Sequence, residues 1–458
     1  MNRDARPERC PVADLTARRL QAIVAGEQAT ARMPSLVAGV VRDGGLVWSG
    51  VHGERTGSAP PTTDTQYRIG SITKTMTAVL VMQLRNEGRL ELADRLDRHL
   101  PGVGYGDRTI RWLLSHSSGM QSEPEGSWWE RSPGVSYQEL TSLMNDSTAP
   151  FAPGTTFHYS NLAFGLLGEL VSHLRGESWR EQVGARVLRP LGMSRTSYLP
   201  VAPAATGYSV HHFANTLTKE PARDTGAMAA AGQLWSTIDD LASYASFLID
   251  GYDEVLPRDA IEEMSTPQSG SAAGGLSGGY GLGLRLVSGG SGTLVGHTGS
   301  MPGFLAGLFV DPVRRTAAMC LANGTAGLRC EGLPIDLLGE LERSEPTVAP
   351  AWTPTTAVPE SVREVLGVWH WGNTAFSFSY DGVDLVVAAL ASGEVVYRFR
   401  PRRDDTFLGT SGYHHGELLR VVRDESGQVH HLVCATFVYT RMPYDPSAPI
   451  PGGVPADS

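Results

Sequence analysis

The spacing of apolar residues predicts strands at both ends of a first domain and helices in its middle. Helical spacing runs from residue 14 to about residue 32, and residues 35–48 are typical of a hairpin that turns at Asp43-Gly44-Gly45. After Ser71 a mostly apolar helical face continues without proline or glycine as far as Gly88. The chain therefore opens with a helix, two strands and a further helix.

More helices are predicted in the middle of the chain before the strands return. Residues 109–114 and 162–174 have helical spacing, and Thr237 resembles the start of a capping box that opens a helix over residues 241–249. Strand-like runs then follow at residues 280–287, 292–295, 304–310 and 316–321. We therefore expect an α/β or α+β domain, in which a helical cluster flanks an antiparallel sheet assembled from the two ends of the domain.

A change of composition marks a second domain. Residues 346–361 are rich in Pro, Thr and Ala with few large apolar residues, which is typical of a linker. Beyond them, short alternating runs such as residues 375–380 are separated by turns such as Asp381-Gly382. We predict a first domain over residues 1–345, the linker, a small all-β barrel over 362–444 and a disordered tail over 445–458.

Charge and apolar content exclude two classes of partner. The 458 residues carry a formal net charge of -10, and no basic run or aromatic-plus-basic stripe offsets it, which argues against a nucleic-acid partner. The apolar runs are too short to span a bilayer, and the first thirty residues lack the apolar core of a signal peptide. We therefore expect a cytoplasmic protein without a membrane partner.

The cysteines and histidines do not form a recognisable metal motif. The four cysteines make no C-x-x-C pair, and Cys320 and Cys434 lie in apolar strand-like runs, so buried free thiols are favoured over disulfides. Adjacent histidines, as in His414-His415 and His430-His431, tend to point opposite ways in a strand. We expect no metal and no cofactor.

The tetrad Ser71-Ile72-Thr73-Lys74 carries the first candidate chemistry. On a helix, residues three apart are neighbours on one face, so Lys74 can lie beside the Ser71 oxygen and take its proton. The start of a helix also favours a developing oxyanion. Taken alone, the same pattern fits a helix-starting serine followed by a surface lysine.

Two further motifs follow in an order that supports the chemical interpretation. Tyr159-Ser160-Asn161 lies in a loop just before a predicted helix, and His297-Thr298-Gly299 lies between two predicted strands. Together with the segments Leu113-Leu114-Ser115-His116-Ser117-Ser118-Gly119 and Pro190-Leu191-Gly192-Met193, these motifs resemble the serine β-lactamase and penicillin-binding-protein superfamily. The resemblance is closest to its class C, D-peptidase and esterase branch and covers roughly residues 15–340.

The resemblance implies a role for each motif residue. Ser71 would be the nucleophile that forms an acyl-enzyme, and Lys74 its base, made partly neutral by burial and a second cation nearby. Tyr159 would relay a proton to the leaving group, with a pKa lowered from about 10 by the same cations. Asn161 would hold Lys74 and the substrate amide through its carboxamide. The backbone N–H groups of Ser71 and Ser300 would form an oxyanion hole, each donor contributing about 3 kcal/mol.

Each motif residue also has a purely structural explanation. Tyr159 fits a half-buried aromatic, Asn161 a helix cap and His297 a histidine at a strand end. Each of these explanations is adequate for a single residue, but they do not explain why all the motifs occur together in this order along the chain. For His116 we keep the structural explanation, because its segment is typical of a helix exit with local capping bonds.

The third motif departs from the commonest pattern of the superfamily. Penicillin-recognising enzymes commonly carry lysine there, whereas His297 has only a partial charge near neutral pH. A weaker cation disfavours recognition of a β-lactam carboxylate or a free peptide C-terminus. It suits esters, amides or thioesters, and His297 could itself share in proton transfer.

Other residues are candidates for substrate binding. Thr298 and Gly299 belong to the third motif, and Gly232 either lines the pocket or serves helix packing. Trp128-Trp129 lies in a polar loop and forms a binding surface, unless one of the two caps the core. Arg441 at the end of the last strand suits a substrate carboxylate, although its position favours a solvent-exposed arginine somewhat more.

The expected absence of a leader and the added β-domain narrow the resemblance to two kinds of enzyme. One is a penicillin-binding-protein-type thioesterase with a lipocalin-like C-terminal domain, which takes a peptidyl thioester from a carrier domain of a peptide synthetase and closes a macrocycle. The other is an esterase, a D-aminopeptidase or another D-specific peptidase with a similar domain. Cyclisation is our first expectation. A protein that binds peptide or β-lactam without turnover is a third possibility, which the intact Lys74 and Tyr159 disfavour.

Overall fold

The structure of the chain is a computed structural model that describes residues 11–53, 60–142, 144, 146–270, 278–290, 292–348, 351–354 and 357–443. Its contacts divide the chain into two compact units, Met1–Thr347 and Val348–Ser458. The division falls inside the segment predicted as a linker, residues 346–361. The predicted tail, residues 445–458, lies outside the described residues.

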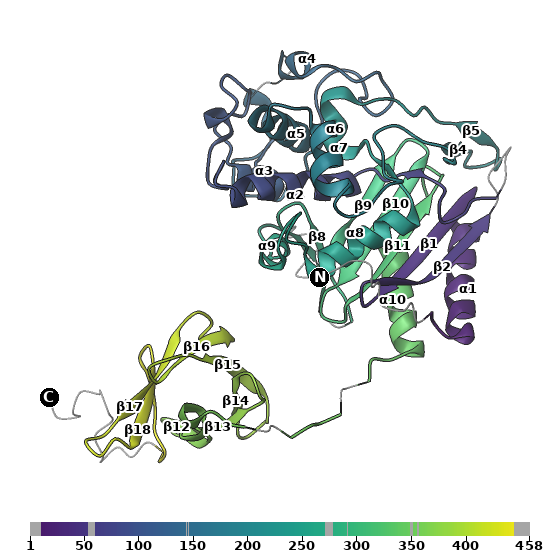
Figure 1. The fold of residues 1–458 in the computed structure, drawn as a ribbon. Coiled ribbons are helices and arrows are strands. Elements are labelled where there is room, and N and C mark those ends of the chain that lie inside the picture. Colours follow the sequence, from purple (N-terminus) through teal and green to yellow (C-terminus); the bar gives the residue numbers. More distant parts are fainter. Residues whose placement is uncertain are drawn as a thin grey trace. The chain divides into compact units, whose positions relative to one another are not determined.

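The first unit is built on a seven-stranded antiparallel sheet (Figure 1). The strand order is β2-β1-β11-β10-β9-β8-β7. The strands are β1 Ser35–Arg42, β2 Gly45–Gly53, β7 Gly278–Tyr280, β8 Arg285–Ser288, β9 Thr293–Met301, β10 Phe304–Asp311 and β11 Thr316–Ala322. Because the N-terminal strand β1 pairs with β11, the two ends of the unit share one sheet, as the sequence predicted.

Two strand predictions were wrong. Residues 280–287 do not form one strand, because Gly283 adopts φ +77° and the Gly281 N–H donates to the Leu284 carbonyl at 2.8 Å, which makes a turn between β7 and β8. The His297-Thr298-Gly299 motif lies inside β9 rather than between strands, because pairing of β9 with β10 continues to Met301.

Helices cover both faces of the sheet. Along β11, alternate residues Ala318, Cys320 and Ala322 pack with α1 (Asp14–Ala31) and α10 (Gly332–Ser344). The residues between them face the core that contains α2 (Ile72–Asn86) and α8 (Ile238–Asp250). The remaining α-helices of the unit are α3 Ile110–Leu114, α4 Tyr137–Ser142, α5 Asn161–Arg175, α6 Trp179–Val183, α7 Ala229–Gly232 and α9 Arg258–Met264. The helical middle of the chain therefore packs as the predicted cluster.

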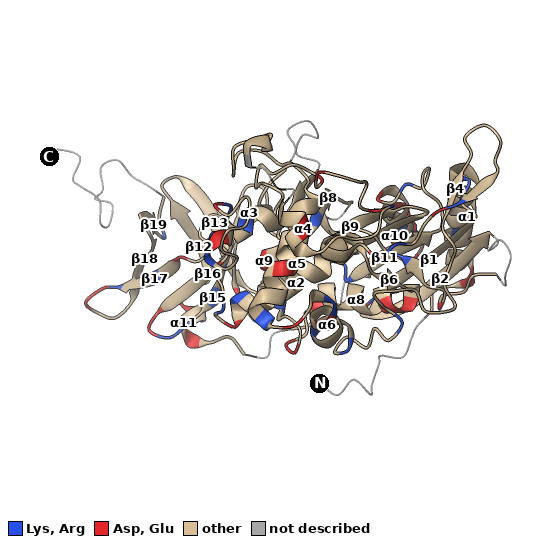
Figure 2. Ribbon diagram, turned by 90° about the horizontal axis from the view of Figure 1, so that it is seen from above, with Lys and Arg blue, Asp and Glu red and all other residues tan. Residues whose placement is uncertain are grey.

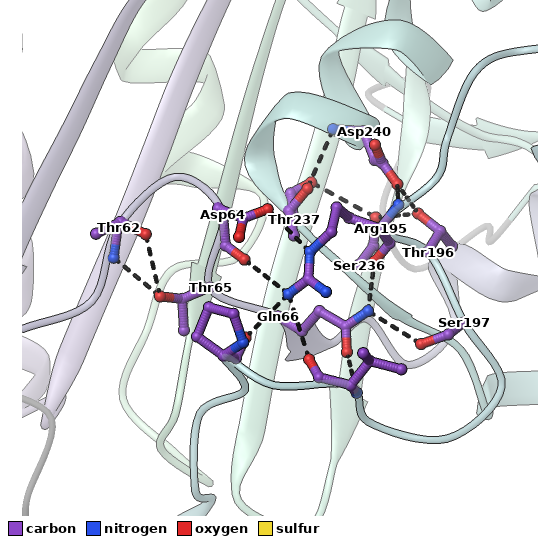
Figure 3. Close-up of polar contacts among 12 residues, drawn as sticks. Thr62, Asp64, Thr65, Gln66, Arg195, Thr196, Ser197, Ser236, Thr237 and Asp240 are labelled. Atoms are coloured by element: carbon purple, nitrogen blue, oxygen red, sulfur yellow. Dashed lines mark hydrogen bonds and ion pairs between the residues drawn. The ribbon is translucent and has the colours of Figure 1, made fainter. Parts of the chain in front are cut away.

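A polar network fixes the chain just before β3 (Tyr67–Arg68), the short strand that leads to α2 (Figure 3). Arg195 lies at its centre: its carbonyl accepts from the Gln66 side chain, and its guanidinium pairs with Asp64 at 2.8 Å. Its backbone N–H donates to Asp240 near the start of α8 at 2.8 Å. The contacts of Arg195 therefore fix the position of the segment that leads through β3 to the turn at the start of α2.

The second unit is an eight-stranded antiparallel barrel that is nearly closed. Its strands, in spatial order, are β12 Gly367–Trp371, β13 Thr374–Tyr380, β14 Leu385–Ala389, β15 Val395–Pro401, β16 Thr406–Ser411, β17 Leu418–Arg423, β18 Val429–Cys434 and β19 Phe437–Tyr439. His370 and Thr440 exchange backbone hydrogen bonds of 2.8 and 2.9 Å, which join the first strand to the end of the last. The predicted all-β barrel is confirmed. A short helix, α11 (Glu360–Arg363), precedes β12 and begins inside the predicted linker.

Acidic and basic residues are intermixed over the described helices and strands (Figure 2). In the described part of the chain, no helix is both long enough and apolar enough to cross a membrane.

Candidate active site

Ser71 and Lys74 lie side by side at the start of α2. Ser71 is the residue before the helix, and Lys74 Nζ lies 2.8 Å from its Oγ. A second hydrogen bond, from Lys74 Nζ to the Ala231 carbonyl at 2.6 Å, fixes the amine from the other side. The spacing of three residues therefore brings amine and hydroxyl together as the sequence suggested.

Burial makes Lys74 a plausible base near neutral pH. Its side chain is inaccessible to solvent, and this burial lowers the pKa of Lys74 to about 7. Glu123 and Glu130 act in the opposite direction. We expected a second cation to contribute, but the charges that act on Lys74 are acidic, so burial accounts for the lowered pKa. A large neutral fraction at pH 7 leaves a lone pair to accept the Ser71 proton.

Tyr159 lies next to this pair but has the opposite pKa perturbation from the one expected. Lys74 Nζ is 5.1 Å from the centre of its ring. Burial raises the pKa of Tyr159 above its ordinary value, and the Ser71 side chain offsets this only in part. The expected lowering was wrong because desolvation of a phenolate outweighs the nearby cations. Tyr159 therefore stays protonated and can act as an acid.

His116 and Tyr280 form an aromatic frame around Tyr159 that the sequence did not reveal. The His116 ring centre lies 4.1 Å from that of Tyr159 and 4.5 Å from that of Tyr280. Its Nδ1 accepts the Ser160 N–H at 3.1 Å, and burial lowers the pKa of His116 well below its ordinary value. His116 does follow the end of α3, at φ 54°, but its ring orders the Tyr159 loop instead of only capping a helix. Nothing in the pattern could pair these segments, because the contact forms only in the folded chain.

His297 is a neutral, fully engaged imidazole. Burial, with Lys74 nearby, lowers the pKa of His297 to about 3. Its Nδ1 lies 2.6 Å from the Thr298 carbonyl, which can only accept, so Nδ1 carries the proton. Its Nε2 accepts the Tyr280 hydroxyl at 2.9 Å. The expectation of a partial charge was therefore wrong, and a share of His297 in proton transfer stays a prediction.

Close backbone approach brings Ser300 next to Ser71. A Cβ on Gly70, which has φ +51°, would lie 2.5 Å from the Ser300 nitrogen. A Cβ on Gly299 would lie 2.0 Å from the Ile69 carbonyl oxygen. The absence of both side chains lets β9 run against the turn before α2. The Ser300 nitrogen therefore lies close to the turn that holds Ser71, and the role of the Ser300 N–H as second oxyanion donor stays a prediction.

Asn161 makes a different contact from the one predicted. Its carboxamide donates to Glu123 at 2.6 Å, and among the described residues it has no hydrogen bond to Lys74. It is also not the helix cap, since the Ser160 side chain accepts the Ala163 N–H in that role. Asn161 therefore positions Glu123 at the rim of the site. The physical reason is that a charged acceptor lies within its reach.

Two carboxylates lie near the reactive groups without an ion pair to Lys or Arg among the described residues. Glu123 accepts Asn161 and the Trp129 indole N–H at 2.7 Å. Burial raises the pKa of Glu130, which accepts the Trp128 N–H at 2.9 Å. Glu123 and Glu130 both influence the pKa of Lys74 and of Tyr159, so their charge reaches the site.

The structure divides the remaining binding candidates. A Cβ on Gly232 would lie 3.1 Å from Met301 and 3.7 Å from both Gly70 and Trp129, so Gly232 does lie beside the nucleophile turn. Trp129 belongs to the hydrophobic core, whereas Trp128 is 60% exposed. One tryptophan therefore caps the core and the other remains available to a ligand.

Arg441 is engaged within the second unit. Its guanidinium donates to the carbonyls of Glu364 and Leu366 at 2.9 Å and stacks on Trp369, 3.8 Å from the ring centre. Arg441 is nevertheless exposed at the end of the last strand, as one of our two interpretations expected. Recognition of a substrate carboxylate by Arg441 stays a prediction.

An open strand edge adjoins the site. Pairing of β8 with β9 ends at Gly296, so the following residues of β9 have no β8 partner on that side. A pocket of about 490 Å³ there is lined in part by Thr298–Ser300, Arg285 and Arg329. Arg285 pairs with Glu331 at 2.6 Å, and Arg329 pairs with two carboxylates. Since both cations are compensated, the pocket suits an uncharged peptide segment that extends along the strand.

Together these groups can form and break an acyl-serine. A neutral amine is in place to take the Ser71 proton, two backbone N–H groups can hold the oxyanion, and a protonated phenol can give a proton to the leaving group. No metal ligand lies within this set of groups.

Comparisons with known proteins agree with this geometry. A family model described as Beta-lactamase matches residues 20–339, and one described as a domain of unknown function (DUF7586) matches residues 358–441. Putative beta-lactamase-like 1 of Homo sapiens is 30% identical over 253 residues, which are 51% of this chain and 50% of that protein. The chain spans about half the length of the curated relatives it matches first.

Three solved structures are similar over most of their length. The crystal structure of SurE is 27% identical to this chain with a TM-score of 0.60, and the match covers 93% of this chain and 99% of that chain. A second structure, of SurE with D-Leu, is 28% identical with a TM-score of 0.59, and the match covers 94% of this chain and 100% of that chain. A D-stereospecific amidohydrolase from Streptomyces sp. is 28% identical with a TM-score of 0.59, covering 73% of this chain and 99% of that one. The chain therefore shares its fold with these proteins.

Proposed function

Because the chain belongs to the β-lactamase family, we propose that Ser71 is its catalytic nucleophile and forms an acyl-enzyme with peptide substrates whose scissile carbonyl belongs to a D-residue. The observation that carries the proposal is the 2.8 Å contact of Ser71 Oγ with a buried amine of pKa about 7. The D-configuration is supported by the similarity to a D-stereospecific amidohydrolase and to SurE, one of whose structures is with D-Leu.

The acylation step uses the groups of the site in a closed proton cycle. Neutral Lys74 takes the proton of Ser71 as Oγ bonds to the carbonyl carbon, and the oxyanion accepts hydrogen bonds from the N–H groups of Ser71 and Ser300. When the tetrahedral intermediate collapses, the carbon–heteroatom bond breaks and Tyr159 gives its proton to the leaving group. The ammonium of Lys74 then returns a proton to Tyr159.

The acyl acceptor that the site favours is an amine of the substrate. Glu123 and Glu130 lie at the site without an ion pair to Lys or Arg among the described residues, so an ammonium group is their natural counter-ion. The ammonium first gives one proton to a carboxylate there, and the resulting amine attacks the acyl carbon. Neutral Lys74 takes the second proton from the nitrogen and passes it to Ser71 Oγ as the acyl–oxygen bond breaks. When the amine belongs to the same peptide, the product is a macrocycle. A peptidyl thioester, delivered free or on a carrier domain, is the corresponding donor.

The neutral His297 also favours this class of donor. A carboxylate next to the scissile bond would find an uncharged imidazole where related enzymes commonly carry lysine, whereas esters, amides and thioesters need no cation there. Hydrolysis of D-residue amides or esters is the second candidate, supported by the similarity to the D-stereospecific amidohydrolase.

A matched pair of peptidyl thioesters separates the two candidates. Both end in a D-residue; one has a free N-terminal amine and the other is N-acetylated. We expect intact-mass spectra of wild type, but not of Ser71→Ala, to show the acyl adduct with both substrates. A cyclic product from the free amine alone supports cyclisation, and linear acid from both supports hydrolysis. An adduct that never turns over would favour the binding protein, and the absence of any adduct would refute Ser71 as the nucleophile.

A further inference from the structure

Three metal-ligating side chains meet in the second unit, where the proposed acyl transfer does not use them. His414 lies in the loop between β16 and β17, Glu417 directly precedes β17, and Cys434 ends β18. One ligand atom from each of the three lies within 4.8 Å of the other two. We propose that His414, Glu417 and Cys434 bind one Zn²⁺ ion.

Two of the three distances between the ligand atoms are close to those of a tetrahedral zinc site, and the third, between His414 and Cys434, is at most 4.8 Å. His414 Nδ1 lies 2.7 Å from Glu417 Oε2, and Cys434 Sγ lies 3.7 Å from the same oxygen. Zinc bonds of about 2.0 Å to nitrogen and oxygen and 2.3 Å to sulfur separate tetrahedral ligands by about 3.3 to 3.6 Å. The carboxylate must therefore withdraw from the imidazole by about 0.6 Å. The Glu417 side chain is 43% exposed, so it has room to move and leaves the fourth position to water.

The donor set balances the charge of the ion. A thiolate, a carboxylate and a neutral imidazole neutralise Zn²⁺, which suits a site where both His414 and Cys434 are fully buried. Zinc binds the thiolate form of cysteine, so binding must break the S–H bond of Cys434 and release that proton to solvent as the Zn–S bond forms. Metal uptake therefore strengthens as the pH rises.

The surroundings of His414 fit a metal ligand. Its Nε2 lies 3.4 Å from the Tyr439 hydroxyl, and the rings of Tyr397 and Phe437 pack on it with centres 4.8 Å away. When Nδ1 binds metal, the ring proton moves to Nε2 and is donated to Tyr439. A ligating histidine typically makes such a second hydrogen bond, which fixes its tautomer and orientation.

The sequence analysis predicted no metal from the adjacent histidines and the absence of C-x-x-C pairs, and neither pattern bears on this arrangement. His415 is exposed while His414 is buried, so the adjacent histidines do point opposite ways. The two partners of His414 are Glu417, which lies three residues further along the chain, and Cys434 on strand β18. Cys434 is brought close because it pairs with Leu419 of β17. A bound ion would fasten the β16–β17 loop to β18.

Cobalt titration of the full chain tests the site. The protein is treated with chelator, kept reduced and titrated with Co²⁺, whose spectrum reports thiolate ligation and coordination number, and bound Co²⁺ is then displaced with Zn²⁺. We expect one Co²⁺ per chain with a thiolate-to-cobalt band in wild type and in the matched control Cys330→Ser, a half-buried cysteine of the first unit. The band disappears in Cys434→Ser, and Tyr439→Phe weakens binding about 10- to 100-fold.

Two results overturn the proposal: a wild-type protein that takes up no stoichiometric Co²⁺, or a thiolate band that survives Cys434→Ser. If circular dichroism shows that Cys434→Ser does not fold, Glu417→Gln replaces it, with at least a tenfold loss of Co²⁺ affinity expected and an unchanged affinity counting against the site. The measurement involves no acylation of Ser71, so its outcome is independent of the proposed enzyme activity.

Discussion

Replacing Lys74 with methionine tests whether a buried and largely neutral amine is the base of the site. Methionine has a similar length and no charge, so it fills the space of the lysine stem without an ammonium group. The folded protein holds the pKa of Lys74 at about 7, against 10.5 for an ordinary lysine. Between these values the unfolded chain binds more protons than the folded one, so the free energy of unfolding rises with pH.

The size of the effect follows from the two pKa values. Below pH 7, where both states are protonated, keeping Lys74 charged in the folded state costs about 5 kcal/mol. The linkage relation gives a change of about 2 to 3 kcal/mol in the free energy of unfolding between pH 6 and pH 9. Lys74→Met removes this contribution, so its stability relative to wild type should be greatest at pH 6 and fall towards pH 9.

Urea denaturation of both proteins at several pH values measures the difference, in which other titrating groups cancel. Lys219→Met is the matched control, at an exposed lysine of β5 (Leu217–Lys219), and should show no such trend. Because Lys74 and Lys219 are the chain's two lysines, ¹³C labelling of lysine also gives the Lys74 pKa directly by NMR. A wild-type to Lys74→Met difference that is constant from pH 6 to pH 9, or an NMR pKa near 10.5, would refute the neutral-base mechanism.

Three further substitutions probe the proton path and the oxyanion hole. Tyr159→Phe should lower the acylation rate of an amide substrate about 10²- to 10⁴-fold. It should lower the rate of a thioester substrate less, because a thiolate leaves without a proton. Equal losses for the two substrates, measured by stopped flow, would contradict the role of Tyr159 as an acid. Tyr280→Phe leaves a buried imidazole nitrogen without its donor and should cost about 1 to 3 kcal/mol in urea denaturation, with an unchanged midpoint as the contrary result. Gly70→Ala should displace the Ser300 N–H and slow acylation about 10²- to 10³-fold. Gly88→Ala, also at positive φ but with open space around it, is its control and should acylate normally.

The sequence predicted the layers of the first unit well, because apolar periodicity reports directly which face of each segment is buried. Helix α8 is an example, because the residues that are not buried, such as Asp239, Ser243 and Ser246, recur at helical spacing along one face. The prediction of one strand failed at residues 281–284. Glycines between the apolar residues allow a turn there, which the apolar pattern alone does not show. The strand prediction also failed at β9, because pairing with β10 carries polar residues of the third motif into the strand.

The candidate site was predictable where spacing along one helix sets the geometry and unpredictable where the environment sets it. Ser71 and Lys74 meet because they are three residues apart. The pKa of Tyr159 and of His297 depends on burial by segments distant in the chain. The sequence led us to expect a lowered pKa for Tyr159 and a partial charge on His297. Asn161 likewise found Glu123, a partner in a loop that had no recognised motif.

The electrostatics of the site give its amine and its imidazoles different tasks. His116 and His297 are both buried and neutral, so they can pack around Tyr159 without adding to the charge near Lys74. A lysine in place of His297 would put a second cation beside Lys74, lower the pKa of Lys74 further and weaken it as a base. A neutral third motif therefore leaves a base that works near pH 7 and a rim, formed by Glu123 and Glu130, that attracts an amine. Both consequences point to acyl transfer in which the substrate needs an amine more than a carboxylate.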